Sequence, residues 1–201
     1  MKKVFYAAMI MFAIAFTGQT TQAQAWDKST KLLGVGIGGS FFFHIDNSYG
    51  TSMQITGQLN FQGEFGVHDY VGVGFTTGVG GRARYSRGLG YWGGYYNPYY
   101  NYNYSNGEVN VPIGVLANFH FYQLIADKIG KDIHSDKLDI YAGLNVGSGI
   151  AAVFRTNETR IVPIAFGGVQ AGARYYFTDK IGVNLEVGFP KLVHGGMVFK
   201  L

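Results

Sequence analysis

The sequence has no cysteine among its 201 residues, which rules out a disulfide and a lipoprotein anchor. It also lacks a recognisable catalytic or metal-binding pattern, because no serine, histidine and acid are spaced as a nucleophile with its base and no His/Asp/Glu spacing is typical of a metal site. We therefore expect no enzymatic activity and no cofactor. Beyond residue 25, no apolar run reaches the roughly 18 residues of a membrane-spanning helix. Entry into a membrane would require strands, because only helices and closed barrels satisfy their backbone hydrogen bonds in lipid.

Residues Met1–Ala25 have the pattern of a cleaved secretory signal peptide. Two lysines precede the apolar run Val4–Phe16, and a polar stretch then ends in Ala23-Gln24-Ala25. A charged start, a short apolar core and an A-x-A site define such signals. Cleavage would leave Trp26 as the first residue, or Gln24 if the alternative site Thr21-Gln22-Ala23 is used. One domain, 26–201, remains.

Charge in this domain is nearly balanced. Loss of Lys2 and Lys3 with the signal reduces the 16 basic residues to 14, against 12 acidic ones. A net charge of this size does not indicate nucleic acid or a strongly charged partner.

Apolar and polar residues alternate most regularly over Ser52–Val67. Odd positions are apolar or glycine, and even positions are almost all polar. Successive side chains of a strand point to opposite faces, so this pattern predicts a strand with one apolar and one polar face. The segment is much longer than a usual soluble strand of about 5–6 residues. A tilted strand that crosses a bilayer needs about 9–11 residues plus an overhang.

The same alternation predicts eight strands and therefore an all-β, antiparallel, up-and-down transmembrane barrel. The expected strands are Leu33–Ile45, Ser52–Val67, Val71–Tyr85, Glu108–Tyr122, Leu138–Ala152, Ile161–Phe177, Ile181–Phe189 and Val193–Leu201. Counted from a periplasmic start, the long loop Ser86–Gly107 lies outside the cell. Gln123–Lys137, which could form one or two helical turns, lies in the periplasm and is longer than the turns typical of that side.

Glycine distinguishes this barrel from a soluble lipocalin-like or avidin-like one, which would place its apolar face inside. The polar-side faces of the first and third strands carry seven glycines: Gly34, Gly36, Gly38, Gly72, Gly74, Gly78 and Gly80. Small residues belong inside a narrow barrel, where they leave room for long polar side chains. The apolar faces end in aromatic residues near both strand termini, as membrane interfaces favour.

Two segments of the sequence resemble a known family. Ile161–Leu201, with GGVQAGARYYFTDKIGVNLEVGF and the closing GGMVFKL, and Asn110–Tyr122, NVPIGVLANFHFY, are similar to the small porin-family outer-membrane barrels of the OmpA and OmpX type. The resemblance implies the fold, an outer-membrane location, contact with lipopolysaccharide and recognition by the barrel-assembly machinery. That machinery usually meets a terminal aromatic residue. Here Leu201 is last and Phe199 lies two residues before it.

Charged side chains on the polar face are the first candidate site. The predicted interior network comprises Glu64, Arg82, Asp139, Arg174 and Glu186, with Arg84, Glu108, Lys200, His44, His120 and His194 on the same face. The side chains of eight strands fill the lumen, so these charges would form ion pairs that plug it. A gated path for protons or small ions is the alternative. Pairing of Phe177 with Ile181 would place Gly172 opposite Glu186 and Arg174 opposite Asn184, so that Arg174 binds Glu186 in a fork.

The second candidate site is the aromatic part of the long loop, with Tyr91, Trp92, Tyr95, Tyr96, Tyr99, Tyr100, Tyr102 and Tyr104. Tyrosine and tryptophan give large contact areas at low entropic cost, so the loop would bind a glycan, lipopolysaccharide or a protein. A disordered, low-complexity tip is the alternative. We expect a monomeric outer-membrane protein with a structural or surface-interaction role. A small pore is the next alternative, and a lipid-modifying enzyme is the least favoured.

Overall fold

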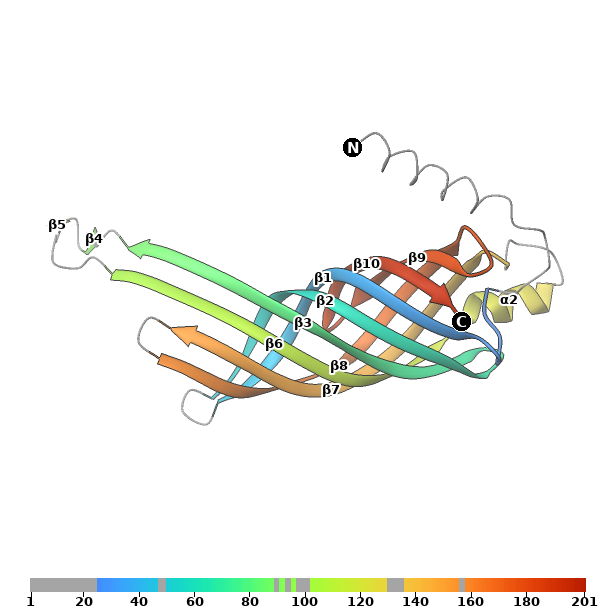
Figure 1. Ribbon diagram of the computed structural model, residues 1–201, viewed down its shortest axis with the longest axis horizontal. Helices are drawn as coiled ribbons and strands as arrows, with labels where there is room; N and C mark the ends of the chain where they lie inside the picture. The colour runs from blue at the N-terminus through green and yellow to red at the C-terminus, as the bar shows by residue number, and fades with distance from the viewer. Residues whose placement is uncertain are drawn as a thin grey trace, which may run out of the picture.

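The computed structural model describes residues 25–46, 50–88, 91–92, 95–96, 102–129, 136–155 and 158–201. Eight antiparallel strands close into one barrel in the order β1-β10-β9-β8-β7-β6-β3-β2 (Figure 1). These strands are β1 (Lys31–Asp46), β2 (Gly50–His68), β3 (Val71–Gly88), β6 (Tyr102–Phe119), β7 (Leu138–Arg155), β8 (Glu158–Tyr176), β9 (Ile181–Gly188) and β10 (Lys191–Lys200). The predicted eight-stranded antiparallel barrel is confirmed. The proposed signal sequence lies outside the described residues except for Ala25.

The barrel carries its apolar side chains outside and its polar side chains inside. Ile37, Ile113 and Val115 are among many large apolar residues on the outer surface that are more than half exposed. Polar residues from all eight strands are buried, including Gln58, Asn60, Asn118 and Gln170. The glycines on the polar face make room for them: a Cβ added at Gly72 would lie 2.7 Å from the ring of Trp26, and one at Gly172 would lie 2.4 Å from that of Tyr141. The predicted assignment of the two faces is therefore correct.

One end of the barrel extends into a long hairpin. β3 and β6 pair as far as Gly88 and Tyr102, well past the other strands (Figure 1). The short strands β4 (Tyr91–Trp92) and β5 (Tyr95–Tyr96) pair with each other near its tip. The predicted loop Ser86–Gly107 is therefore too long. Its sequence is rich in glycine, tyrosine and asparagine and shows no apolar face, so the strands within it could not be recognised from alternation. We call this the hairpin end.

The opposite end, the helix end, carries the helix α2 (Phe121–Ile129) and the last residue, Leu201 (Figure 1). The predicted strand Glu108–Tyr122 is wrong at its end, because β6 stops at Phe119. His120 turns its ring inside and donates its backbone N–H to the Tyr70 carbonyl oxygen, 2.8 Å away. The chain then enters the helix, where helical turns were expected only from residue 123. No helix in the described part of the chain is long and apolar enough to cross a membrane.

The β9–β10 hairpin is shorter than its neighbours and ends part way along the barrel. Past its tip, β1 pairs directly with β8 through Phe43 opposite Ala165 and His44 opposite Ile164. β9 ends at Gly188, whose φ of 153° and close approach to the Val169 carbonyl oxygen favour glycine. Between this tip and the hairpin end, the interior holds an apolar cluster of Phe42, Ala151, Val162, Ile164 and Phe166.

Candidate functional site

Polar side chains fill the interior in three clusters along the barrel. The first lies at the helix end and contains Glu64, His120, Asp139 and Arg174. The second lies further in and contains Gln62, Tyr141, Glu186 and Lys191. The third lies towards the hairpin end and contains His44, Arg82, Glu108 and Asn110. We call them the mouth, middle and outer clusters.

In the mouth cluster, two cations bridge two carboxylates. Arg174 donates from Nη1 to Asp139 Oδ2 at 3.1 Å and from Nη2 to Glu64 Oε2. His120 contacts the other oxygen of each acid, through Nδ1 to Asp139 at 2.8 Å and through Nε2 to Glu64 at 3.0 Å. All four side chains are at most 1% exposed. Two positive and two negative groups therefore balance when His120 is protonated.

The geometry of His120 favours the doubly protonated ring, because each nitrogen faces a carboxylate oxygen. His120 lies between β6 and α2, outside the strands. Burial disfavours its charge, but the hydrogen bonds and charges of Asp139 and Glu64 outweigh burial and raise the pKa of His120 above its ordinary value.

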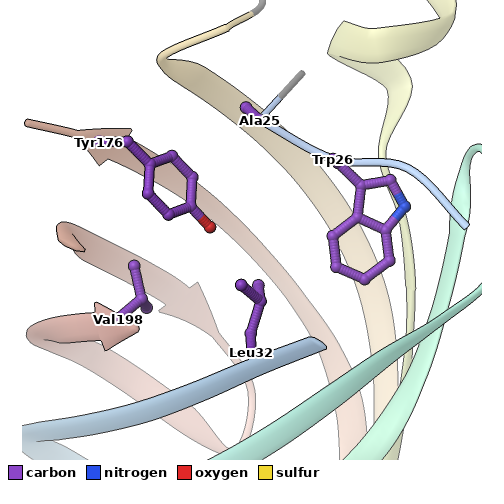
Figure 2. Close-up of a cluster of buried hydrophobic side chains, with 5 residues drawn as sticks. All are labelled: Ala25, Trp26, Leu32, Tyr176 and Val198. Carbon is purple, nitrogen blue, oxygen red and sulfur yellow. The ribbon is translucent and has the colours of Figure 1, made fainter. Parts of the chain in front are cut away.

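Trp26 covers the mouth cluster. Its indole stacks on the His120 ring, with ring centroids 3.6 Å apart and planes 6° apart, and its side chain is fully buried. Figure 2 shows Trp26 among the buried apolar residues Ala25, Leu32, Tyr176 and Val198 at this end. The segment that follows Trp26 is attached to β2, because Gly66 donates its N–H to the Thr30 carbonyl oxygen at 2.8 Å. Sequence reasoning identified Trp26 only as a possible first residue and missed this role.

Asp27 stabilises the turn that brings Trp26 into the mouth. Its carboxylate accepts hydrogen bonds from Ser29 N and Oγ and from Thr30 Oγ1, at 2.7–2.9 Å. Partial burial opposes the charge of Asp27, but these hydrogen bonds outweigh it and lower the pKa of the carboxyl group. At neutral pH, the ionised Asp27 carboxylate therefore stabilises the turn that holds Trp26 over the mouth cluster.

In the middle cluster, Glu186 is the shared acceptor. Lys191 Nζ donates to Glu186 Oε2 at 2.6 Å and to Gln62 Oε1 at 2.8 Å. The Tyr141 hydroxyl donates to Glu186 Oε1 at 2.7 Å. Sequence analysis had placed Lys191 in a turn, and so it missed the cation that pairs with Glu186.

The predicted fork between Arg174 and Glu186 is wrong, although its register is confirmed. Gly172 does lie opposite Glu186, and Arg174 opposite Asn184. The space over Gly172 is filled by the Tyr141 ring, whose centroid lies 4.0 Å from Arg174 Cζ. The guanidinium therefore stacks on this ring and turns to Glu64 and Asp139.

The outer cluster centres on Glu108. It accepts hydrogen bonds from Arg82 Nε at 3.0 Å and Asn110 Nδ2 at 3.2 Å, and lies 2.9 Å from His44 Nε2. Arg82 thus belongs to a cluster separate from the other four predicted residues, and its side chain is 38% exposed. Lys200 lies at the helix end with Nζ 4.3 Å from the Tyr176 ring centroid. The Arg84 side chain lies outside the described residues.

One serine and histidine do meet in the interior, but their hydrogen bonds do not make a nucleophile and base. Ser40 Oγ lies 2.9 Å from His194 Nε2, which also lies 3.1 Å from the Gly39 carbonyl oxygen. A carbonyl can only accept, so Nε2 carries the proton and is not available as a base towards Ser40. Ser40 in turn donates to Gln58 Oε1 at 2.5 Å. Within the described residues, no group of three or more acids and histidines is placed to hold a metal ion.

Free space in this region is small. A cavity of about 10 Å³ is lined by Ser40, Phe42, Gln58, Asn60, Thr76, Pro112, Asn145, Phe166, Pro190 and Lys191. Its volume corresponds to about one water molecule. The arrangement can therefore hold charges in place, and this cavity has no room for a solute.

The predicted binding loop lies at the tip of the hairpin end. Tyr91 and Trp92 form β4, Tyr95 and Tyr96 form β5, and Tyr102 and Tyr104 belong to β6. Tyr99 and Tyr100 lie outside the described residues. The structure thus brings four of the eight residues together in one small hairpin.

Comparisons with known proteins identify the fold. No family model matches the chain, and no curated protein matches it by sequence. Among solved structures, the N-terminal β-barrel domain of Pseudomonas aeruginosa OprF is similar, with a TM-score of 0.53 and 11% identity over 88% of this chain and 99% of that one. The attachment invasion locus protein Ail of Yersinia pestis (TM-score 0.43, 11% identity, 86% and 95% covered) and Neisserial surface protein A (0.40, 9%, 85% and 93%) also match. The likeness to the OprF domain confirms an OmpA/OmpX-like eight-stranded barrel as the fold.

Proposed function

We propose that this chain is an integral outer-membrane protein, exported by its N-terminal signal, whose closed barrel displays the β3–β6 hairpin for contact with a ligand outside the cell. The observation that carries the proposal is the apolar outer surface. In β6, every outward residue from Val109 to Phe119 is apolar and exposed. This stretch is as long as a tilted strand needs to cross a bilayer, about 9–11 residues. In water, so large an exposed apolar surface would cause aggregation.

The same stretch supports a direction for the hairpin. β3 and β6 continue past Val109 to Gly88 and Tyr102, beyond the apolar part of the wall. A short turn joins β2 to β3 at the other end, and barrels of this architecture keep short turns in the periplasm and long loops outside. The Tyr-rich tip would therefore face the exterior, where lipopolysaccharide, a glycan or a protein could bind it.

The filled interior favours an anchoring and display role over the alternative of a pore. Each interior cluster joins side chains from at least three strands, and the apolar cluster around Phe42 lies between the middle and outer clusters. Conduction would require all of these to separate. Planar-bilayer recordings test this: steady, large conductance of the purified protein would favour the pore.

Location and direction can be tested together. The protein should fractionate with outer membranes, resist extraction by alkaline carbonate and migrate differently on gels before and after boiling. Proteinase K added to intact cells should cut within Ser86–Gly107 and spare Gln123–Lys137. Extraction as a soluble protein would refute the membrane location, whereas the reverse cleavage pattern would refute only the direction.

The binding role is tested by removing the tip while keeping the barrel. Because Gly88 and Tyr102 lie directly opposite each other, residues 89–101 can be replaced by an Asn-Gly turn, which suits a two-residue hairpin. Cells carrying this variant should lose capture of lipopolysaccharide, glycans or envelope-exposed proteins that the parent captures. A second variant, with the eight aromatic residues changed to serine at unchanged loop length, should lose it equally. Retention by both variants would exclude the loop as the binding site.

A further inference from the structure

The helix α2 presents an apolar face away from the barrel. Gln123 and Ala126 are its buried residues, and they lie on the side that packs against the barrel. Ile125 and Ile129 lie one turn apart on a neighbouring side, about a third of a turn around the helix from the buried residues, and are 42% and 53% exposed. Lys128 is also exposed and lies on the flank of this face, next to Ile125 around the helix. A short helix in water would be expected to show the reverse arrangement, with its isoleucines packed inward.

A side-chain hydrogen bond joins α2 to the barrel. The Tyr70 hydroxyl, in the β2–β3 turn, donates to Asp127 Oδ2 at 3.0 Å. Gln123 Nε2 donates to Asp127 Oδ1 at 2.9 Å, within the same helix. The Asp127 hydrogen bond raises the pKa of the Tyr70 hydroxyl. In this orientation the two isoleucines are exposed.

The apolar wall of the barrel runs up to the start of α2. Phe119, the last residue of β6, is 42% exposed on the outer surface and is separated from α2 only by His120. At the same end, Val73 on the neighbouring strand β3 and Val67 on the next strand, β2, are also exposed. An apolar helix face flanked by a lysine and next to a lipid-facing wall fits the boundary between acyl chains and head groups, where the lysine can reach anionic phosphates.

We propose that α2 is an interfacial helix that rests on the inner leaflet of the membrane, with Ile125 and Ile129 in the acyl region and Lys128 among the head groups. This inference rests on the proposed membrane location of the barrel. It also accounts for the unusual length of the periplasmic connection, which carries a helix that steadies the barrel rim against the lipid.

The absence of cysteine makes the test direct, because each single-cysteine variant carries one label. We would compare Ile125→Cys and Ile129→Cys with Val115→Cys on the wall of the barrel and Asp179→Cys in the exposed β8–β9 turn at the same end. Lys128→Cys tests the flank. Each full-length variant is labelled with a nitroxide and reconstituted in vesicles of phosphatidylethanolamine and phosphatidylglycerol. Collisions with oxygen, which partitions into lipid, are compared with collisions with a water-soluble nickel complex.

Labels at 125 and 129 should collide more with oxygen than with nickel, as the label at 115 does, and the label at 179 should show the reverse. The label at 128 should fall between them. If 125 and 129 match 179 while 115 remains in lipid, the inference about α2 is wrong and the membrane location stands. If 115 also matches 179, the membrane location itself fails. Labels at 125 and 129 that are aqueous in vesicles but shielded in native envelopes would overturn the lipid proposal in favour of a periplasmic protein.

Discussion

Trp26 stacks on His120 with ring centroids 3.6 Å apart and nearly parallel planes, so the start of the barrel domain closes the helix end of its own lumen. Beneath the indole, His120 bridges Glu64 and Asp139. A flat aromatic ring over a protonated imidazole combines stacking with a cation–π attraction. It also keeps water from the charges below, which strengthens their mutual attraction.

Replacing Trp26 by alanine should lower the free energy of unfolding by about 3–5 kcal/mol, the usual cost of removing a buried tryptophan. Trp26→Phe should recover part of the loss, because a smaller ring can still stack. Urea unfolding of the protein refolded in lipid vesicles, followed by gel mobility without boiling, measures both. Trp92→Ala at the hairpin end is the matched control and should leave stability unchanged. A Trp26→Ala protein as stable as its parent would contradict the closure.

The raised pKa of His120 predicts a pH dependence with a definite sign. The folded protein holds the imidazolium proton above the ordinary pKa of 6.5. The stability from this proton is therefore complete below pH 6.5 and is lost as pH rises through the folded-state pKa. His120→Gln should flatten the stability curve over this alkaline range. Equal slopes for parent and variant would show that His120 is not charged in the folded state.

Arginine substitutions on the outer surface of the barrel test whether lipid or water surrounds it. Leu59→Arg changes an outward residue in the middle of β2, and Val115→Arg changes one in the middle of the apolar stretch Val109–Phe119 of β6. Each should cost about 2–4 kcal/mol in lipid. Val67→Arg, near the end of β2, should cost about 0–1 kcal/mol because an arginine there can reach water. Refolding titrations in vesicles measure all three. Equal tolerance of the three variants would indicate that the wall faces water.

Alternation made the fold predictable, because a period of two assigns every residue to one face. Thus the register of Gly172 with Glu186 followed from the turn Thr178–Lys180, and the structure confirms it. The strand ends were less predictable. The alternation correctly places His120 inside, but nothing in it indicates that the strand ends at Phe119. Likewise, β3 continues to Gly88 after its apolar residues have ended.

The partners of charged residues were the least predictable feature, because they depend on which bulky group fills the lumen. Arg174 and Glu186 lie on paired strands as expected, but the Tyr141 ring from β7 occupies the space over Gly172. The Tyr141 hydroxyl donates a hydrogen bond to Glu186, and its ring stacks on the Arg174 guanidinium. The position of Tyr141 on the polar face was visible in the sequence. The competition between Tyr141 and the guanidinium for the space over Gly172 is visible only in the folded barrel.

The corrected pairing leads to a sharper prediction about charge coupling. Arg174→Gln leaves Glu64 and Asp139 with only His120 between them, and an uncompensated buried charge typically costs about 3–5 kcal/mol. Arg174→Gln with Glu64→Gln restores the balance of one cation and one carboxylate. The double variant should therefore be more stable than Arg174→Gln alone.

A parallel cycle with Glu186 provides the control for this coupling. Glu186 has Lys191 as its own cation, with Nζ 2.6 Å from its carboxylate, so removing Arg174 leaves it paired. Arg174→Gln with Glu186→Gln should thus regain much less stability than the combination with Glu64→Gln, whereas Lys191→Gln should couple strongly to Glu186→Gln. Unfolding free energies of the singles and doubles in vesicles give each coupling energy by difference. If Glu186 couples to Arg174 more strongly than Glu64 does, the predicted pairing of Arg174 with Glu186 is correct. The bridging of Glu64 and Asp139 by Arg174 is then wrong.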